Sequence, residues 1–89
     1  MRMKDKAYIV LLSYKDCLND ELYIMAVTKD KNKAYEKLKT IAEDECKTSW
    51  INDYDQEDLD RFDFTENYFG ARYDDKLTEI WIEEKEIED

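Results

Sequence analysis

The chain has 89 residues, a formal net charge of −10, 43% hydrophobic residues and twelve aromatic side chains. A chain of this length and hydrophobic content is typical of one globular domain, which we assign to residues 1–89. The absence of histidine excludes histidine-based acid–base catalysis and the commonest zinc ligand, and a single glycine excludes glycine-rich phosphate loops. We therefore predict a non-enzymatic protein without a cofactor or a metal site.

The first elements are predicted to be two strands in a hairpin. Residues 7–14 (AYIVLLSY) are apolar and rich in branched and aromatic side chains, which is typical of a strand buried on both faces. Residues 15–21 are polar and contain an Asn-Asp pair, so they favour a turn. Residues 22–27 (LYIMAV) then form the second strand.

One long helix follows, from Lys31 to about Ile51. Ala34, Leu38 and Ile41 recur at three- and four-residue steps and form an apolar stripe, and Thr28 or Asp30 caps the start. The chain contains no proline that would end the helix early.

The stretch from Asp53 to Glu66 (DYDQEDLDRFDFTE) is the most unusual part of the sequence, because seven of its fourteen residues are acidic. If Asp53 or Asp55 caps a short second helix, Leu59 and Phe62 fall on one side of it. An acid-rich loop is the alternative, and the pattern slightly favours the helix.

A second hairpin completes the predicted fold. Residues 67–73 and residues 76 or 77 to 87 read as strands joined at Asp74 and Asp75, and the second of them alternates between polar and apolar residues. Gly70, inside the first of these strands, indicates a bulge or a close approach of backbones. The predicted fold class is α+β, in the order β-β-α-(short α)-β-β, with a mainly antiparallel four-stranded sheet covered by one long helix.

The negative charge is concentrated in the second half of the chain. Residues 1–33 carry a net charge of +2, residues 34–50 carry −1 and residues 51–89 carry −11. Such a surface repels nucleic-acid phosphate and attracts basic proteins, so we expect no direct nucleic-acid binding. The lysines between residues 29 and 39 are interpreted as solvated side chains rather than as a nucleic-acid patch.

The compartment is predicted from cysteine usage and hydropathy. Cys17 and Cys46 are far apart without metal-type spacing, and no signal peptide is recognised, so both are predicted to be free thiols in the cytoplasm. No apolar stretch approaches the length that crosses a membrane, so no membrane partner is expected.

The density of carboxylates raises the question of calcium. On the pattern of a calcium-binding helix–loop–helix, Asp53, Asp55 and Glu57 take positions one, three and five. Asp58 stands in place of the required glycine, however, and Phe64 in place of the bidentate glutamate. The motif therefore fails at its two most demanding positions.

The main hypothesis is an acidic interaction protein. It binds the basic surface of a nucleic-acid-handling protein, occupies the cationic groove and inhibits that protein, in a complex that salt weakens. The predicted partner-binding residues are the carboxylates of the second half of the chain: Asp53, Asp55, Glu57, Asp58, Asp60, Asp63, Glu66, Asp74, Asp75, Glu79 and Glu83.

In size, acidity and lack of catalytic residues the chain resembles small phage-encoded inhibitors of bacterial defence, including anti-CRISPR and anti-restriction proteins. The resemblance is one of general character and rests on no motif; it implies the same inhibitory function.

Two alternatives stay open. One is a small phage or bacterial protein that sequesters a nucleotide signal as a homodimer, in a pocket lined by Tyr8, Tyr14, Tyr23 or Arg72. The other is a plain protein-assembly module whose acidity serves only solubility.

Overall fold

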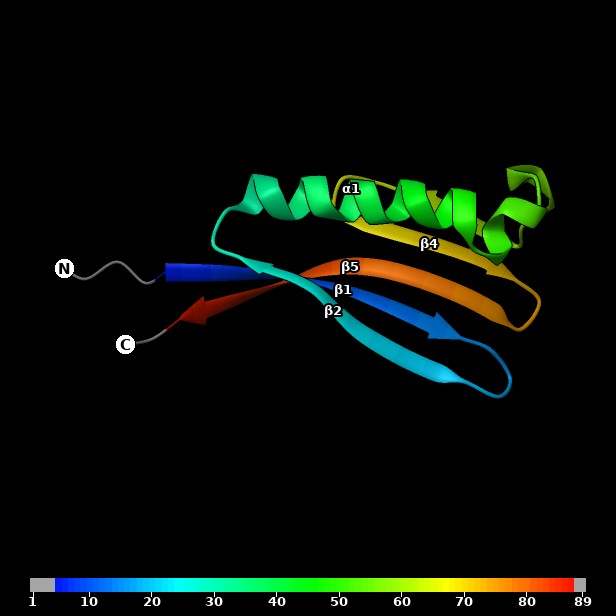
Figure 1. The fold of residues 1–89 in the computed structure, drawn as a ribbon, viewed down its shortest axis with the longest axis horizontal. Helices are drawn as coiled ribbons and strands as arrows, with labels where there is room; N and C mark the ends of the chain where they lie inside the picture. Colours follow the sequence, from blue (N-terminus) through cyan, green and yellow to red (C-terminus); the bar gives the residue numbers. More distant parts are fainter. Residues whose placement is uncertain (1–4, 88–89) are drawn as a thin grey trace.

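The computed structural model describes residues 5–87, which form a five-stranded antiparallel sheet with one α-helix on one face (Figure 1). The elements in chain order are β1 (Asp5–Lys15), β2 (Asp20–Thr28), α1 (Lys31–Thr48), β3 (Arg61–Phe64), β4 (Tyr68–Tyr73) and β5 (Lys76–Ile87), and the strands lie side by side in the order β2-β1-β5-β4-β3. The α+β class and the long helix are confirmed. The predicted four-stranded sheet is wrong, because β3 adds a fifth strand.

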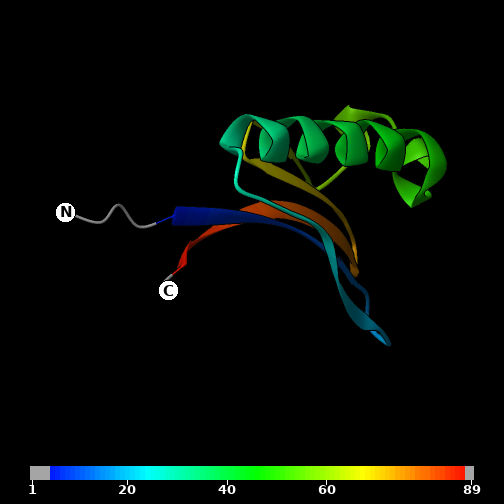
Figure 2. The ribbon, with the colours of Figure 1, turned by 60° about the vertical axis from the view of Figure 1, so that its left-hand side comes forward.

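The core lies between α1 and one face of the sheet. The predicted apolar stripe of the helix is buried there, with Ala34, Leu38 and Ala42 fully buried. It packs in one cluster with side chains from three strands: Val10, Leu12, Phe69, Ala71 and Ile80. Burying each large apolar side chain contributes about 1.5–3 kcal/mol. This contact is therefore the main source of stability, and Figure 2 shows the helix lying along this face.

The start of α1 is capped as predicted, but the helix ends earlier than predicted. The Asp30 carboxylate accepts hydrogen bonds from the backbone N–H groups of Asn32 and Lys33. The helix ends at Thr48, because Ser49 is extended and its hydroxyl bonds both the Glu45 carbonyl and the Ile51 N–H. A serine side chain that hydrogen-bonds nearby backbone groups replaces the bonds that the next helical turn would make, and the helix ends there.

The short second α-helix is absent from the described residues. In its place are two 3-10 turns, η1 (Trp50–Asp53) and η2 (Gln56–Asp58), followed directly by β3. Tyr54, Asp55 and Leu59 are extended, so no continuous helix can form. Leu59 and Phe62 both pack against the core, but from a loop and a strand rather than from one helix face.

Gly70 lies in regular strand register, between Asp63 of β3 and Glu79 of β5. The close approach is made by a side chain, since a Cβ atom at Gly70 would lie 2.9 Å from two ring carbons of Tyr68. Of the two alternatives predicted for Gly70, the bulge is wrong, and the tight packing is present but is made by a side chain instead of a backbone. A bulge occurs instead between β1 and β2, at the step from Val10 to Leu11.

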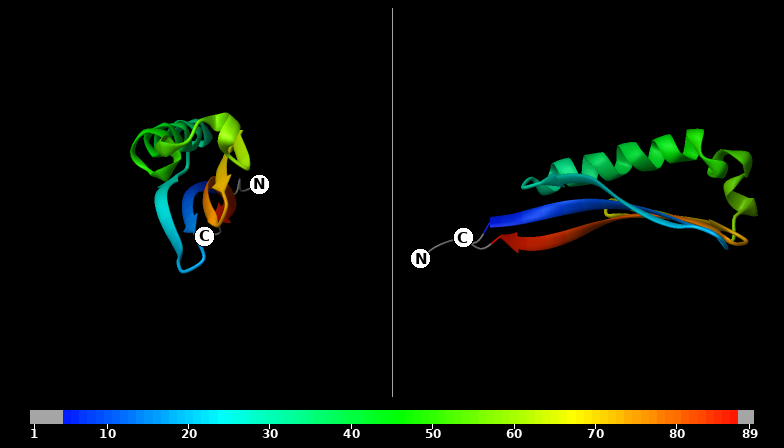
Figure 3. Two further views of the ribbon diagram at one scale, coloured as in Figure 1. Left: turned by 90° about the vertical axis from the view of Figure 1, so that its right-hand side faces the viewer. Right: turned by 60° about the horizontal axis from the view of Figure 1, so that its bottom comes forward.

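The second face of the sheet has no helix over it, as the end-on view in Figure 3 shows. We call it the open face. It carries Ile9, Leu11 and Ser13 of β1, and the residues paired with them on the neighbouring strands. The fold therefore offers three surfaces to partners: the open face, the edges of the sheet, and the end formed by residues 50–60.

Candidate functional site

Two acidic segments meet at the end of the sheet where β4 turns into β5. The backbone N–H of Asp74 donates to Oδ2 of Asp60 at 2.8 Å, and the N–H of Asp60 donates to the carbonyl of Arg72 at 2.8 Å. Asp74 has a positive φ of 54°, which an aspartate tolerates better than most residues. The acidic loop is thereby joined to the turn at Asp74 and Asp75.

Aromatic stacking strengthens this junction. The ring of Tyr54 stacks on that of Tyr73 with centroids 4.2 Å apart, and Trp50 meets Tyr54 edge-on at 6.1 Å. Ile51, which is buried, and Leu59, which packs against the core, hold the two ends of the loop. We call the exposed carboxylates of this region the acidic end: Asp53, Asp55, Glu57, Asp58, Asp60, Asp74 and Asp75.

The other four predicted partner-binding residues lie elsewhere. Asp63 and Glu79 are on the open face, and Glu83 lies further along β5 with Oε2 3.8 Å from Nζ of Lys85. Glu66 lies in the loop after β3, beside Tyr35 of α1. The structure thus gathers seven of the eleven predicted carboxylates and separates four from them. Glu57 lies in a 3-10 turn and Asp60 lies after it, so no α-helix face presents these two carboxylates together.

The carboxylates Asp63 and Glu79 are engaged in a polar cluster on the open face. The Tyr68 hydroxyl donates to Oε2 of Glu79 at 2.7 Å, and Arg61 lies 5.3 Å from the centroid of the Tyr68 ring. Nε of Arg61 also donates to Oδ2 of Asp63 at 2.5 Å. Burial, and then the bond to Glu79, raise the pKa of Tyr68 to about 12. Arg61 thus forms an ion pair with Asp63, whereas Glu79 keeps its charge and accepts a hydrogen bond from the neutral Tyr68 phenol.

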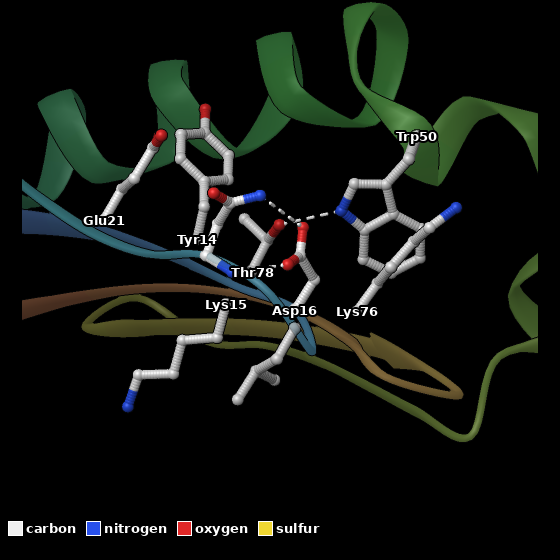
Figure 4. A pocket seen from close by; sticks show the side chains of 9 residues that line it. Tyr14, Lys15, Asp16, Glu21, Trp50, Lys76 and Thr78 are labelled. Carbon is white, nitrogen blue, oxygen red and sulfur yellow. Dashed lines mark hydrogen bonds between the residues drawn. The ribbon is translucent and has the colours of Figure 1, made fainter.

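A shallow pocket of about 220 Å³ lies beside the turn between β1 and β2 (Figure 4). Nε1 of Trp50 donates to Oγ1 of Thr78 at 3.0 Å across its wall. Two backbone N–H groups, those of Leu18 and Asn19, bond the Asp16 carboxylate and lower its pKa. The charged lining contains both signs, from Lys15, Asp16, Glu21 and Lys76. This mixture selects neither an anion nor a cation.

Of the four residues proposed for a nucleotide pocket, only Tyr14 and Tyr23 lie together, with their ring centroids 6.1 Å apart. Tyr14 lines the pocket in Figure 4, whereas Tyr8 lines a different depression beside Lys31 and Glu84. Arg72 lies on the open face, opposite the side to which Tyr8 and Tyr14 contribute. A pocket containing all of these residues would need a second chain.

Both cysteines are free, as predicted. A hydrogen bond with the Asp75 carboxylate raises the pKa of the exposed Cys17 thiol, and burial raises the pKa of the Cys46 thiol. Raised pKa values reduce the thiolate fraction, so neither side chain is an activated nucleophile. Within residues 5–87, no group of three or more Cys, Asp or Glu side chains is arranged to hold a metal ion.

Two features were not found from the sequence. Glu45 is buried against β1 and bonds Tyr14; its place on the apolar stripe of α1, four residues after Ile41, is the signal that could have revealed it. The other feature is the position of β2 at the edge of the sheet with Leu22, Ile24 and Val27 exposed. Hydropathy alone gives no strand order, so this exposure could not be read from the sequence.

Comparison with protein families, curated proteins and solved structures found no match for this chain. Among residues 5–87, no helix is both long enough and apolar enough to cross a membrane. The function is therefore inferred from the geometry of the surfaces described above.

Proposed function

We propose that the protein uses its acidic end to bind the cationic groove of a nucleic-acid-handling protein and to exclude nucleic acid from that groove. The proposal includes no catalytic step and no cofactor. Nucleases of bacterial defence are one class of partner, as the resemblance to phage-encoded inhibitors implies, and a cytoplasmic site of action belongs to the same proposal.

The observation that carries the proposal is the joining of two acidic segments by the bond between Asp74 and Asp60. The stack of Tyr54 on Tyr73 holds the same segments together. A charged surface that is already ordered loses less conformational entropy on binding than a flexible acidic tail does. A rigid group of carboxylates is what a groove built for phosphate can recognise.

The charge balance supports the same interpretation. Residues 53–60 contain five carboxylates and no basic residue. Nearby, Nε of Arg72 points to the carbonyl of Asp74 at 3.5 Å, so this guanidinium is partly occupied by backbone. Seven exposed carboxylates in one region produce a field that steers a cationic partner and raises its association rate.

The test is competition with nucleic acid. The protein is immobilised, exposed to a bacterial lysate, and eluted with either salt or an excess of duplex DNA or RNA. We expect nucleic-acid-binding proteins to be retained and to be released by both treatments. Retained proteins that nucleic acid does not displace would contradict the proposal.

A triple variant, Asp55→Asn, Glu57→Gln and Asp58→Asn, tests the site itself. It removes three charges with little change in shape, and it leaves Asp60 and its bond to Asp74 intact. We expect retention of the same proteins to fall at least tenfold, because each lost charge pair weakens steering and contact.

The matched control removes three charges from the exposed side of α1 with Glu36→Gln, Glu43→Gln and Asp44→Asn. Its net charge equals that of the first variant. If both variants lose retention equally, net charge rather than the acidic end determines binding, and the proposed site is wrong.

A further inference from the structure

The two edge strands of the sheet differ in length and in charge. β3 has four residues, and its open-face side chains are Arg61 and Asp63, both charged. β2 has nine residues, and the six between positions 22 and 27 (LYIMAV) carry no charge. Short or charged edges prevent pairing with another chain, whereas long apolar edges invite it. Among the described strands, only β1 pairs with β2, so β2 lies at the edge of the sheet (Figure 3) and its outer backbone groups pair with no other strand.

We propose that β2 pairs antiparallel with β2 of a second copy, so that two five-stranded sheets join into one continuous ten-stranded sheet. The register sets Asp20 of each copy opposite the partner's Lys29. Such a pairing is closed and two-fold symmetric, so it produces a dimer rather than a fibre. This inference rests on β2 alone and is independent of the proposed function.

The bulge between β1 and β2 determines which registers are possible. Ala26 pairs with Val10 and Ile24 pairs with Leu11, so Met25 is the extra residue of β2. As a result Leu22, Ile24 and Val27 lie on the open face, while Tyr23 and Ala26 lie on the helix side.

The proposed register matches faces on both sides of the bulge. Leu22 lies opposite the partner's Val27, and Tyr23 lies opposite the partner's Ala26. A shift by one residue would place Leu22 opposite the partner's Ala26 or the partner's Thr28, which belong to the helix side. The match holds on both sides of the centre, where Ile24 lies opposite the partner's Met25, and the paired strand is about 30 Å long at 3.4 Å per residue.

The neighbouring strand β1 shows what pairing does to open-face residues. Leu11 and Ser13, with a strand on each side, are only 6% and 4% exposed, and Ile9 is half-buried, although no helix covers that face. Leu22, Ile24 and Val27 are 60–68% exposed with a strand on one side only. A second flanking strand would give them the environment of Leu11.

Charge complementarity identifies the occupant as a second copy. The charged residues of β2 are Asp20 and Glu21 at its start, and Lys29 follows its end. Antiparallel pairing places the acidic start of each strand beside the lysine of the other. It also sends the two acidic ends to opposite ends of the dimer, because each lies near the start of its own β2, where the N–H of Cys17 contacts Asp75. A protein of net charge −10 can then self-associate with little repulsion.

Sedimentation velocity at increasing concentration tests for the dimer, with Ile24→Lys as the interface variant. Ile24 is 68% exposed, so the substitution is tolerated in the monomer, and circular dichroism confirms that it folds. We expect a wild-type dimer and a monomeric variant. A wild-type protein that stays monomeric at several hundred micromolar, or a dimer that Ile24→Lys leaves intact, would overturn the proposal.

Charge reversal tests the register. Asp20→Lys and Lys29→Asp each create like-charged pairs at both ends of the interface, so each alone raises the dimer dissociation constant about tenfold. Mixed together, the two variants restore opposite charges at both ends. Native mass spectrometry is then expected to show the heterodimer above its statistical half; a random mixture would show that the register is wrong.

A control for charge reversal uses exposed residues of α1, Asp44→Lys and Lys39→Asp, which are expected to leave dimerisation unchanged. Lys29 also lies 3.6 Å from Asp5 within its own chain, but both side chains are about two-thirds exposed, and such pairs contribute little. Equal weakening by the control variants would indicate a nonspecific effect of charge and would count against the register.

Discussion

The hydroxyl of Tyr14 on β1 donates a hydrogen bond to a carboxylate oxygen of Glu45 on α1, thirty-one residues further along the chain. Glu45 is only 8% exposed and lies on the side of the helix that faces the sheet. A buried carboxylate without a donor is strongly destabilising. The bond therefore fixes where the last turns of α1 lie on the sheet, near the start of the acidic loop.

Tyr14→Phe is expected to destabilise the protein by about 1.5–3 kcal/mol, the usual contribution of a hydrogen bond to a charged group. The matched control is Tyr23→Phe, because the Tyr23 hydroxyl also donates to a glutamate, Glu21, but both residues are exposed. That control is expected to change stability by less than about 0.5 kcal/mol. Urea unfolding measures the free energy of unfolding of both variants. Equal losses would show that the bond to the buried Glu45 stabilises the protein no more than the bond to the exposed Glu21.

The raised pKa of Tyr68, about 12 against an ordinary value of 10.0, predicts late ionisation and loss of stability at high pH. The folded state favours the protonated phenol of Tyr68. The stabilisation of the folded state by this phenol is therefore complete below pH 10 and is lost as the pH rises from 10 to about 12. Absorbance at 295 nm is expected to show two late phenols, because burial and the bond to Glu45 also raise the pKa of Tyr14, and a variant at Glu79 identifies the one that belongs to Tyr68. Glu79→Gln removes the neighbouring charge and should shift that phenol to lower pH. An unchanged titration would contradict the assigned cause.

Gly70→Ala is predicted to displace the ring of Tyr68, because the new Cβ would lie 2.9 Å from two of its ring carbons. Overpacking of this kind costs about 1–3 kcal/mol. In a Tyr68→Ala background the same change should be neutral or slightly stabilising, since the ring is gone and alanine is favoured over glycine in a strand. Thermal unfolding of the wild type, the two single variants and the double variant measures the interaction energy between positions 68 and 70. Additive effects would show that the Tyr68 ring does not obstruct the new side chain.

The periodic spacing of apolar residues in the sequence was sufficient to predict those helices and strands that bury one regular face. The stripe of Ala34, Leu38 and Ile41 predicts α1, and the alternation of Thr78, Ile80 and Ile82 predicts β5; the structure contains both. The region 50–64 could not be predicted in this way. Its short apolar spacing fits a helix as well as a strand, and the pairing of β3 with β4 decides between them.

The candidate site shows a similar division. The carboxylates of residues 53–60 are adjacent in the sequence, so their clustering was expected. The position of Asp74 against Asp60 depends on a hydrogen bond between residues fourteen apart in the chain, and neither charge nor hydropathy along the sequence gives a signal for it. Strand order is equally hidden, and β2 was predicted without any indication that it forms an edge.

The thiol of Cys17 is predicted to react slowly, because its hydrogen bond with Asp75 raises its pKa. Asp75→Asn removes the charge, lowers that pKa and should speed alkylation at pH 8, measured in a Cys46→Ser background so that one thiol reports. Asp74→Asn is the control, since its backbone rather than its side chain makes the bond to Asp60. If both variants are alkylated at the same rate, the net negative charge near Cys17, and not its hydrogen bond with Asp75, determines the reactivity of the thiol.

Lys33→Glu is predicted to stabilise the protein. The first turn of α1 contains no acidic residue and two lysines, Lys31 and Lys33, at the end of the helix where the dipole is positive. Replacing one lysine by glutamate should contribute about 0.3–1 kcal/mol, which raises the melting temperature by about 2–6 °C in a domain of this size. The backbone N–H of Asp30 already bonds Oγ1 of Thr28, so the gain comes from the dipole rather than from a new capping bond. Lys37→Glu, in the middle of the helix, changes the net charge equally and should not stabilise the protein; a similar gain from both would assign the effect to net charge instead.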